Sequence, residues 1–172
     1  MTVLVNNAAI AVVQKTTELT DLRDSFNATF NANVTSVAAV TSTFLPLLRR
    51  SSRPQVIHVS SGRASLQRST GPNFPPTAVL PYSISKVALN ALTIEQQKIE
   101  NARTGNDPDG EKVDFYTINP GHCRTAFNGW SGLKDPLDGA EVVVRLVMAK
   151  RGEWKAGSFL EFEDGKMREV PW

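Results

Sequence analysis

Residues 55–62 read Gln-Val-Ile-His-Val-Ser-Ser-Gly. Gln55 to Val59 is short and rich in β-branched residues, and the serines and glycine after it favour a turn, so the stretch predicts a buried strand that ends in a loop. Apolar residues recur at helical spacing before it, from Phe26 toward Leu48, and after it, from about Tyr82. Strands that alternate with long helices are typical of a parallel sheet covered by helices. The stretch therefore predicts the α/β fold class.

The same alternation continues toward both ends of the chain. Further strands are predicted at Thr2 to Val5, Val113 to Ile118 and Ser158 to Phe162, and helices from Thr20 to Leu48, from about Tyr82, and from Pro136 to Lys150. Thr20 and Asp21 are expected to cap the first helix, and a polar, hairpin-like end follows the last strand. Gly62 to Pro81 is predicted to be a long irregular loop, and such loops are often functional. Residues 1–172 are expected to form a single domain.

The composition of the 172-residue chain is that of an ordinary globular protein, with 41% hydrophobic and 21% charged residues. The net charge of +2 is spread without a basic face, which argues against nucleic acid as a partner. No apolar run is long enough to span a bilayer, and the apolar start is interrupted by Asn6 and Asn7, unlike a secretory signal. We therefore expect a cytoplasmic protein that binds no membrane. The single cysteine, Cys123, excludes an intrachain disulfide, and we predict no metal site.

Tyr82-Ser83-Ile84-Ser85-Lys86 places a phenol and an ammonium group on one face of a helix, one turn apart. A free tyrosine has a pKa of about 10 and is a poor acid or base at neutral pH, whereas a nearby positive charge favours the phenolate. This spacing also arises often by chance. The pair alone therefore leaves both readings open, a catalytic pair and two unrelated side chains.

Five short motifs, in a fixed order, resemble those of the short-chain dehydrogenase/reductase family. They are Asn6-Asn7-Ala8-Ala9, the helix residue Asn33, the strand end Ser60-Ser61, Tyr82 with Lys86, and the loop from Asn119-Pro120-Gly121 to Thr125. The match covers the whole chain and departs from the family pattern at Ala9, where the family has glycine. In isolation the serines could simply close a strand, and Asn33 could be an ordinary polar residue of a helix. Together with Tyr82 and Lys86, they favour the family.

The resemblance implies a role for each catalytic residue. Tyr82 would donate the proton to a substrate carbonyl, and Ser61 would orient that carbonyl by a hydrogen bond. Lys86 would lower the pKa of the tyrosine and contact the nicotinamide ribose, and Asn33 would hold a water in the proton relay. The resemblance also implies cofactor contacts from Asn6, Ala8, Tyr82, Lys86, Pro120, Gly121 and Thr125.

The resemblance further implies that the chain is the C-terminal part of a Rossmann-type, doubly wound parallel sheet that lacks the first βαβ units. Gly-x-Gly-x-x-Gly spacing occurs nowhere before Asn6, and this glycine-rich turn is the element that holds the pyrophosphate. As it stands, the chain would bind the cofactor weakly and be weak or inactive as an enzyme. A bared edge along Thr2 to Val5 predicts self-association.

The end of the chain resembles the monomeric carbonyl reductases through Gly139-Ala140-Glu141, Gly157-Ser158-Phe159 and Trp172. This resemblance implies NADP(H) rather than NAD(H) as the cofactor. Two hypotheses of function follow. The first is an oxidoreductase that interconverts a small-molecule ketone or aldehyde and its alcohol. The second is a non-catalytic remnant of such an enzyme that acts as a binding or interaction module.

Overall fold

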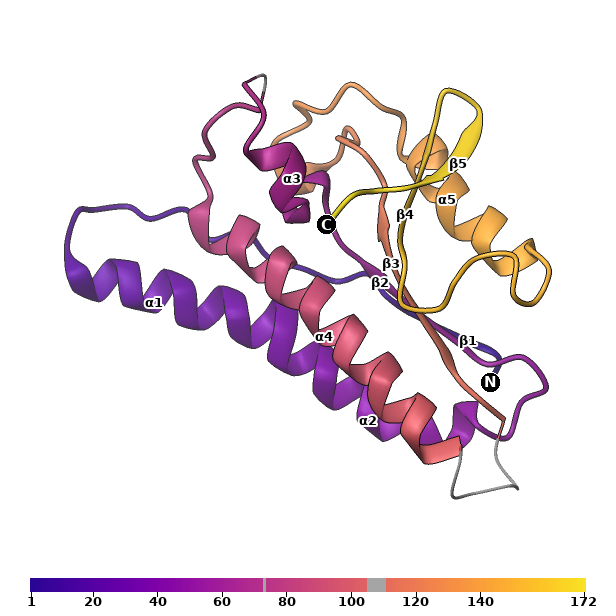
Figure 1. Cartoon of the computed structure of the whole chain (residues 1–172). Helices are drawn as coiled ribbons and strands as arrows, with labels where there is room; N and C mark the ends of the chain where they lie inside the picture. Colours follow the sequence, from indigo (N-terminus) through magenta and orange to yellow (C-terminus); the bar gives the residue numbers. More distant parts are fainter. Residues whose placement is uncertain (73, 105–110) are drawn as a thin grey trace.

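The computed structural model describes residues 1–72, 74–104 and 111–172. In these residues the chain forms a five-stranded sheet of order β1-β2-β3-β4-β5 (Figure 1). The strands are β1 (Val3–Asn6), β2 (Gln55–Val59), β3 (Asp114–Asn119), β4 (Phe159–Glu163) and β5 (Lys166–Glu169). Strands β1 to β4 run parallel, and β5 is antiparallel to β4. The predicted α/β class with a parallel sheet is confirmed.

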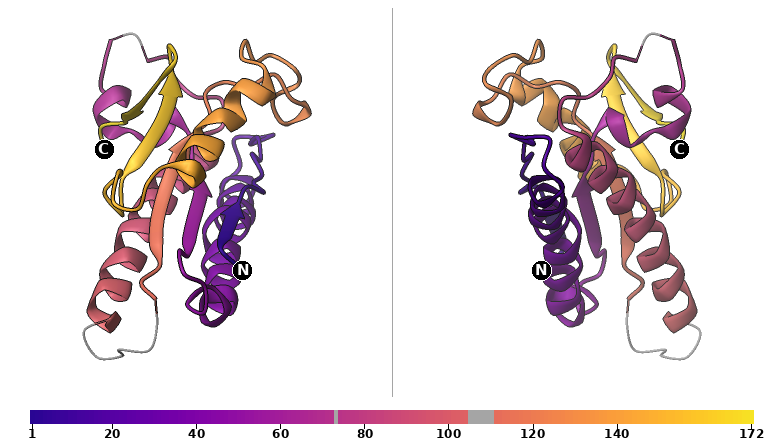
Figure 2. Two further views of the ribbon diagram at one scale, coloured as in Figure 1. Left: turned by 90° about the vertical axis from the view of Figure 1, so that its right-hand side faces the viewer. Right: turned by 90° about the vertical axis from the view of Figure 1, so that its left-hand side faces the viewer.

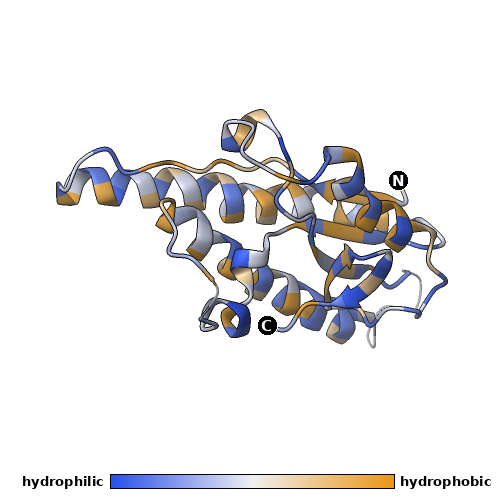
Figure 3. Cartoon of the chain, turned by 90° about the horizontal axis from the view of Figure 1, so that it is seen from above, coloured by the Kyte–Doolittle hydropathy of each residue, from blue (hydrophilic) through white to orange (hydrophobic). Residues whose placement is uncertain are grey.

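Five α-helices and three shorter turns connect the strands of the described part. The helices are α1 (Leu19–Phe30), α2 (Ser36–Leu48), α3 (Leu66–Ser69), α4 (Leu80–Thr104) and α5 (Pro136–Met148). A π-helical turn covers Asn31–Thr35, and 3-10 turns cover Gly62–Ala64 and Ala126–Asn128. Figure 3 shows apolar and polar segments alternating along the long helices, as expected of helices with one buried face.

The two faces of the sheet bury different residues because successive side chains of a strand point in opposite directions. On β2, Val56 packs in one cluster with Leu48 of α2, whereas Ile57 packs in another with Val142 of α5. His58, on the same side as Val56, contacts α4 through a hydrogen bond. Helices α2 and α4 therefore cover one face and α5 the other, an arrangement visible in Figure 1.

The helix predicted from Thr20 to Leu48 is not continuous. The π-helical turn Asn31–Thr35 separates α1 from α2 and contains the fully buried Asn33. Turns of this type are rare and frequently occur at functional sites. The apolar spacing did not reveal it because the residues on either side still share one face. Asn33 therefore sits at a local distortion of the backbone rather than in a regular helix.

The predicted cap of this first helix is wrong. Helix α1 begins at Leu19, and its N-cap residue Glu18 makes no side-chain cap hydrogen bond. The carboxylate of Asp21 instead accepts hydrogen bonds from the backbone amides of Lys15 and Thr16, both at 2.6 Å. Asp21 thus stabilises the loop that precedes the helix.

The stretch predicted as one irregular loop, Gly62 to Pro81, holds a 3-10 turn and α3. Each begins after a serine whose hydroxyl accepts a hydrogen bond from a backbone amide, Ser61 from Arg63 at 3.3 Å and Ser65 from Arg68 at 3.2 Å. Side-chain caps of this kind satisfy the free amides of a first turn. Ser61 and Ser65 therefore give the first part of this loop, next to β2, a regular structure.

The chain ends in the hairpin β4–β5, as its polar end predicts. The turn contains Asp164 and Gly165 with φ angles of 53° and 75°, the left-handed conformation that tight hairpin turns require. Beyond the hairpin, the backbone oxygen of Trp172 accepts a hydrogen bond of 3.0 Å from the amide of Gln67 in α3. Figure 2 shows the hairpin and α3 side by side at this end of the molecule.

Strand β1 pairs with β2 along one edge, and no other strand of the described residues pairs with it. Val5, in the middle of this strand, remains 40% exposed. Within the described residues, the edge of β1 is therefore one of the two open edges of the sheet, the other being that of β5.

No helix within residues 1–72, 74–104 and 111–172 is long and apolar enough to cross a membrane.

Candidate active site

The carboxyl ends of the parallel strands meet at one edge of the sheet, which is where ligands bind in folds of this class. Asn6 ends β1, Ser61 lies two residues after β2, and Pro120 follows β3 directly. Helix α4 begins two residues before Tyr82, so this residue lies in its first turn. The fold thus places the predicted catalytic residues on neighbouring elements at one edge.

Lys86 is the buried cation of this edge. It is 2% exposed, and its Nζ donates a hydrogen bond of 2.7 Å to the backbone oxygen of Val59 at the end of β2. Nζ also lies 5.6 Å from the centroid of the Tyr82 ring. Burial lowers the pKa of Lys86 to about 8, because the charged ammonium loses its hydration. Lys86 therefore titrates closer to neutral pH than an ordinary lysine.

Burial shifts the pKa of Tyr82 in the opposite direction, upward. The pKa of its phenol is raised, chiefly because burial disfavours the phenolate, while a hydrogen bond with Ser61 and the charge of Arg63 partly offset this effect. Its ring packs against Phe127 with 5.4 Å between the ring centroids. The predicted net lowering of this pKa is therefore wrong, because desolvation outweighs the hydrogen bond with Ser61 and the charge of Arg63. A phenol with a raised pKa is protonated at neutral pH.

Asn33 uses its side-chain amide to hold the loop after β1. Its Oδ1 accepts a hydrogen bond from the amide of Ile10 and its Nδ2 donates to the oxygen of the same residue, both at 2.8 Å. The Nδ2 group also donates to the hydroxyl of Ser85 at 3.0 Å. Asn33 therefore links the π-helical turn, the loop after β1 and the first turns of α4.

Asn6 directs its amide nitrogen into the protein. Its Nδ2 donates to Thr41 Oγ1 at 3.0 Å and lies 3.1 Å from His58 Nδ1, while His58 Nε2 lies 3.0 Å from Gln96 Oε1. Burial lowers the pKa of His58 to about 4, so its ring is neutral, accepts from Asn6 and donates to Gln96. The side-chain donors of Asn6 are thus engaged in packing β1 against β2. Nothing in the sequence pattern singles out His58 or Gln96.

The loop after β3 requires glycine at position 121. Gly121 has a φ angle of 83°, and a Cβ atom there would lie 2.9 Å from Cδ of Lys134. The Nζ atom of Lys134 is held by the Glu163 carboxylate at 2.8 Å. Further along, the amide of Thr125 donates to Asn128 Oδ1 at 3.4 Å. Of the remaining predicted cofactor residues, Ala8 is exposed and Pro120 is partly buried.

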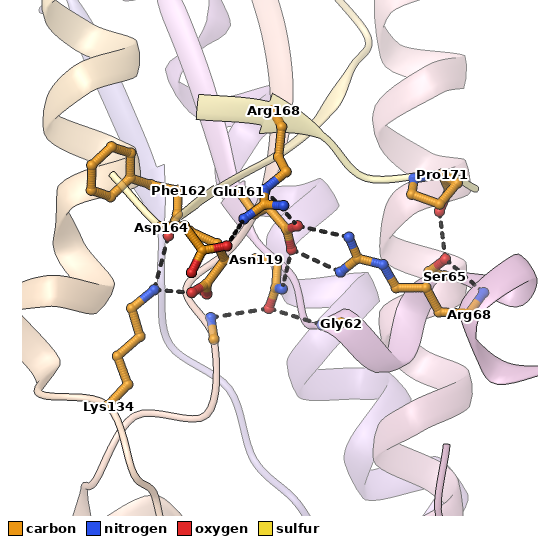
Figure 4. Close-up of polar contacts among 12 residues, drawn as sticks. Gly62, Ser65, Arg68, Asn119, Lys134, Glu161, Phe162, Asp164, Arg168 and Pro171 are labelled. Atoms are coloured by element: carbon orange, nitrogen blue, oxygen red, sulfur yellow. Dashed lines mark hydrogen bonds and ion pairs between the residues drawn. The ribbon is translucent and has the colours of Figure 1, made fainter. Parts of the chain in front are cut away.

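Asn119, which belongs to the fifth motif but was given no role, joins this edge to β4 together with Arg68 and Glu161, which no motif includes (Figure 4). Asn119 accepts hydrogen bonds from the loop amides on both sides of the site, and it donates to Glu161 at 2.9 Å. Arg68 makes a bidentate ion pair with the same carboxylate at 2.7 and 2.8 Å. A charged residue in the middle of an apolar strand and an asparagine before a Pro-Gly pair were the signals available in the sequence.

The donors at this edge suit the nicotinamide and ribose end of a dinucleotide. An ammonium group has three N–H donors, and among the described contacts Lys86 uses one of them on Val59. The Tyr82 phenol and the Ser61 hydroxyl are O–H groups within hydrogen-bonding reach of each other. Within the described residues, no group of three or more His, Cys, Asp or Glu side chains could hold a metal ion. The arrangement can therefore bind hydroxyl groups through Lys86, and it holds two further O–H groups close to each other.

Comparison with known proteins gives consistent matches. A family model described as short chain dehydrogenase matches residues 1–134. A curated short-chain dehydrogenase/reductase of Aspergillus fumigatus is 39% identical over 173 residues, covering 99% of this chain and 66% of its own length.

Solved structures match over the same extent. The NADPH-bound carbonyl reductase from chicken fatty liver has a TM-score of 0.73 at 22% identity, with 100% of this chain and 66% of that protein covered. The carbonyl reductase Sniffer of D. melanogaster has a TM-score of 0.72 at 25% identity, with 99% and 66% covered. The chain therefore spans 66% of the length of each of these proteins.

Proposed function

The chain belongs to the short-chain dehydrogenase family, and we propose that its site reduces the carbonyl of a small-molecule ketone or aldehyde, or oxidises the alcohol, with a nicotinamide cofactor. One observation carries this proposal. The Ser61 hydroxyl, the Tyr82 phenol and the buried Lys86 ammonium gather at the carboxyl end of β2. On this proposal, residues 1–172 form one part of a dinucleotide-binding and catalytic domain.

The two O–H donors would stabilise the charge that builds on the carbonyl oxygen during reduction, for which the bound cofactor supplies the hydride. Tyr82 is suited to donate the proton because its raised pKa keeps the phenol protonated at neutral pH. Ser61 would donate the second hydrogen bond to the same oxygen. Both donors are held by rigid elements, Tyr82 by the first turn of α4 and Ser61 by the end of β2.

Lys86 would act in two ways. Its ammonium group, 5.6 Å from the centroid of the Tyr82 ring, would stabilise the phenolate left after proton transfer. The N–H donors that Val59 does not use would bind the hydroxyl groups of the nicotinamide ribose. Asn33 would accept a hydrogen bond from a relay water through the second lone pair of Oδ1, because Ile10 uses only one.

The remaining proposed cofactor contacts come from loops at the same edge, namely from Asn6, Ala8, Pro120, Gly121 and Thr125. We propose NADP(H) rather than NAD(H), on the basis of the carbonyl-reductase-like ending that includes Gly157-Ser158-Phe159 and Trp172. We also propose a cytoplasmic location, which the single cysteine suits.

A second candidate function, that of an interaction module, is favoured by the open edge of β1. Unpaired backbone groups along such an edge can add a strand from another chain, and Val5 there is 40% exposed. We propose self-association through this edge. Val5→Lys should shift the sedimentation of the chain toward the monomer, whereas unchanged sedimentation would contradict pairing through β1.

The experiment that separates the two functions is an assay of the purified chain with NADPH or NADH and a panel of ketones and aldehydes. Residues 1–172 are expected to bind the cofactor weakly and to turn over slowly, and Tyr82→Phe should abolish this slow cofactor oxidation without weakening cofactor binding further. Tyr116→Phe is the matched control, because Tyr116 is the other tyrosine of the chain and donates to the oxygen of Trp154 at 3.2 Å, away from the site. Equal turnover in Tyr82→Phe and in the natural chain would contradict the reductase, whereas absence of turnover in the natural chain would favour the interaction module.

A further inference from the structure

A buried carboxylate connects β4 to the edge that carries the site (Figure 4). Glu161 is 3% exposed, and its carboxylate accepts from Arg68 of α3 at 2.7 and 2.8 Å and from Asn119 Nδ2 at 2.9 Å. Arg168 of β5 adds a longer ion pair of 3.6 Å. Burial alone would raise the pKa of Glu161, but the hydrogen bonds from Arg68 and Asn119 lower it overall. Glu161 therefore stays ionised and acts only as an acceptor.

The amide oxygen of Asn119 joins two loops. Oδ1 accepts from the backbone amide of Gly62 at 2.9 Å and from that of Gly121 at 3.1 Å. Gly62 follows Ser61 directly, and Gly121 belongs to the loop proposed to face the nicotinamide. Because an amide oxygen has two lone pairs, these two bonds use its full capacity. One atom thus sets the separation of the two loops.

The orientation of this amide depends on Glu161. The oxygen and nitrogen of an asparagine amide are nearly equal in size, so packing alone does not distinguish them. In the reverse orientation Nδ2 would face two N–H donors and both loop hydrogen bonds would be lost. A carboxylate accepts but cannot donate, so Glu161 selects the orientation in which Nδ2 points toward β4.

We propose that Glu161 is a positioning residue that, through Asn119, holds the Ser61–Gly62 turn and the Pro120–Gly121 loop at their working separation. This proposal rests on the proposed function for the consequence on catalysis, and on the geometry of the described residues for the positioning itself. Arg68 keeps the carboxylate charged and fixed, while Asn119 transmits its orientation. The residues that carry out the chemistry would therefore depend on a carboxylate that never touches the substrate.

Two single substitutions and their combination test this proposal. In Glu161→Gln, one amide oxygen must serve both Arg68 and Asn119, so the hydrogen bond that holds Nδ2 of Asn119 toward β4 is weakened and the two loop hydrogen bonds are less firmly fixed. In Asn119→Asp, a second carboxylate faces Glu161 and is repelled. In the double variant, the new amide at position 161 can donate its N–H to the new carboxylate at position 119 and accept from Arg68 through its oxygen. The carboxylate at position 119 then accepts from both glycine amides, and the net charge of the group is the same as in the natural chain.

The measurement is amide hydrogen exchange of Gly62 and Gly121 by NMR in the full chain, with the β2 amide of Ile57 as an internal reference. Each single variant should accelerate exchange at both glycines about tenfold relative to Ile57, and the double variant should return it to within about threefold of the natural chain. Arg168→Gln is the matched control: it removes a partner of the same carboxylate without touching Asn119, and should leave both glycines unchanged.

Unchanged exchange at both glycines in the single variants, or no recovery in the double variant, would overturn the proposal. If a single variant does not fold, the double variant decides: protected glycine amides support the proposal and rapid exchange overturns it. Turnover is measured separately, with a fall in kcat but little change in KM expected for Glu161→Gln. The predicted exchange pattern without any turnover would support the positioning role and contradict only the proposed function.

Discussion

Burial has opposite outcomes for two charged residues of this chain, Lys86 and Glu161: it disfavours the charged form of the first, whereas partners preserve the charge of the second. Lys86 is 2% exposed, its pKa is lowered to about 8 by desolvation, and no carboxylate of the described residues compensates for it. Glu161 is 3% exposed, yet Arg68 and Asn119 hold its pKa below the ordinary value. A buried group with ion-pair and hydrogen-bond partners keeps its charge. The pKa of a buried group without an ionic partner depends instead on the charge of whatever binds beside it. The buried charge on α4, Lys86, therefore belongs to the proposed catalytic residues, whereas the buried charge on β4, Glu161, belongs to the residues that position them.

Apart from Tyr82, the residue whose loss should lower turnover most is Ser61, which lies on the chemical side of this comparison. Ser61→Ala should lower turnover about 100- to 1,000-fold, because one of the two donors to the developing oxyanion is lost. Ser60→Ala is the matched control, since the buried Ser60 hydroxyl donates to Asn90 at 2.7 Å and serves packing. Steady-state kinetics on both variants check this. Equal losses in the two variants would mean that the Ser-Ser pair acts only as structure.

On the supporting side, Arg68→Met should lower the free energy of unfolding by about 3 kcal/mol, because it leaves the Glu161 carboxylate buried without its main partner. Arg168→Met, which removes the longer and half-exposed ion pair, should lower it by less than about 1 kcal/mol. Urea denaturation measures both values. Similar losses in the two variants would show that Glu161 is not held chiefly by Arg68.

The ion pair of Arg68 and Glu161 makes the free energy of unfolding depend on pH. The pKa of Glu161 is lower in the folded chain than its ordinary value of 4.5, so the carboxylate contributes stability above pH 4.5 that is lost as the pH falls through the folded-state value. This acid-side loss should be smaller in Arg68→Met than in the natural chain. An unchanged acid profile would contradict the ion pair as its source.

A smaller change in stability is expected at Lys86, the buried charge without an ionic partner. Lys86→Met should raise the free energy of unfolding at pH 7 by about 2 kcal/mol, because the cost of burying the ammonium disappears and one hydrogen bond is lost. It should also weaken cofactor binding and lower turnover. Chemical denaturation and a cofactor titration measure the two effects. Loss of stability in this variant would place Lys86 among the structural charges, with Glu161.

Lys86 also makes stability depend on pH in the alkaline range. Its pKa is about 8 in the folded chain and 10.5 ordinarily, so the unfolded chain binds more protons between these values and stability rises with pH there. The difference in stability between the natural chain and Lys86→Met should therefore shrink from pH 8 to pH 10.5. A constant difference would contradict the lowered pKa.

The sequence predicted the structural features that are determined by residues adjacent along the chain. Gln55 to Val59 forms β2 within the predicted bounds, because a β-branched run followed by turn residues is a local signal. Tyr82 and Lys86 lie one helical turn apart, as their spacing predicts, and helix α4 begins at Leu80. These signals were enough for the fold class and for the elements that carry the site.

Features that depend on distant contacts could not be predicted in this way. Arg68 and Glu161 are 93 positions apart, and their ion pair exists only once α3 packs beside β4. The raised pKa of Tyr82 depends on burial, whose effect exceeds those of the Arg63 charge and the hydrogen bond with Ser61. The π-helical turn around Asn33 was also missed, because apolar spacing does not register one extra residue in a turn.

Isotope transfer tests whether this site uses the hydride of a nicotinamide cofactor to reduce a carbonyl, with Tyr82 as the acid. The chain is incubated with a ketone and NADPH that carries deuterium at the reactive C4 position, and the alcohol is analysed by mass spectrometry. Because weak activity is expected of residues 1–172, we expect only a small amount of alcohol, carrying one deuterium, from the natural chain and from Tyr116→Phe, and none above background from Tyr82→Phe. An unlabelled alcohol, or equal labelled product from Tyr82→Phe, would contradict Tyr82 as the acid of a hydride transfer.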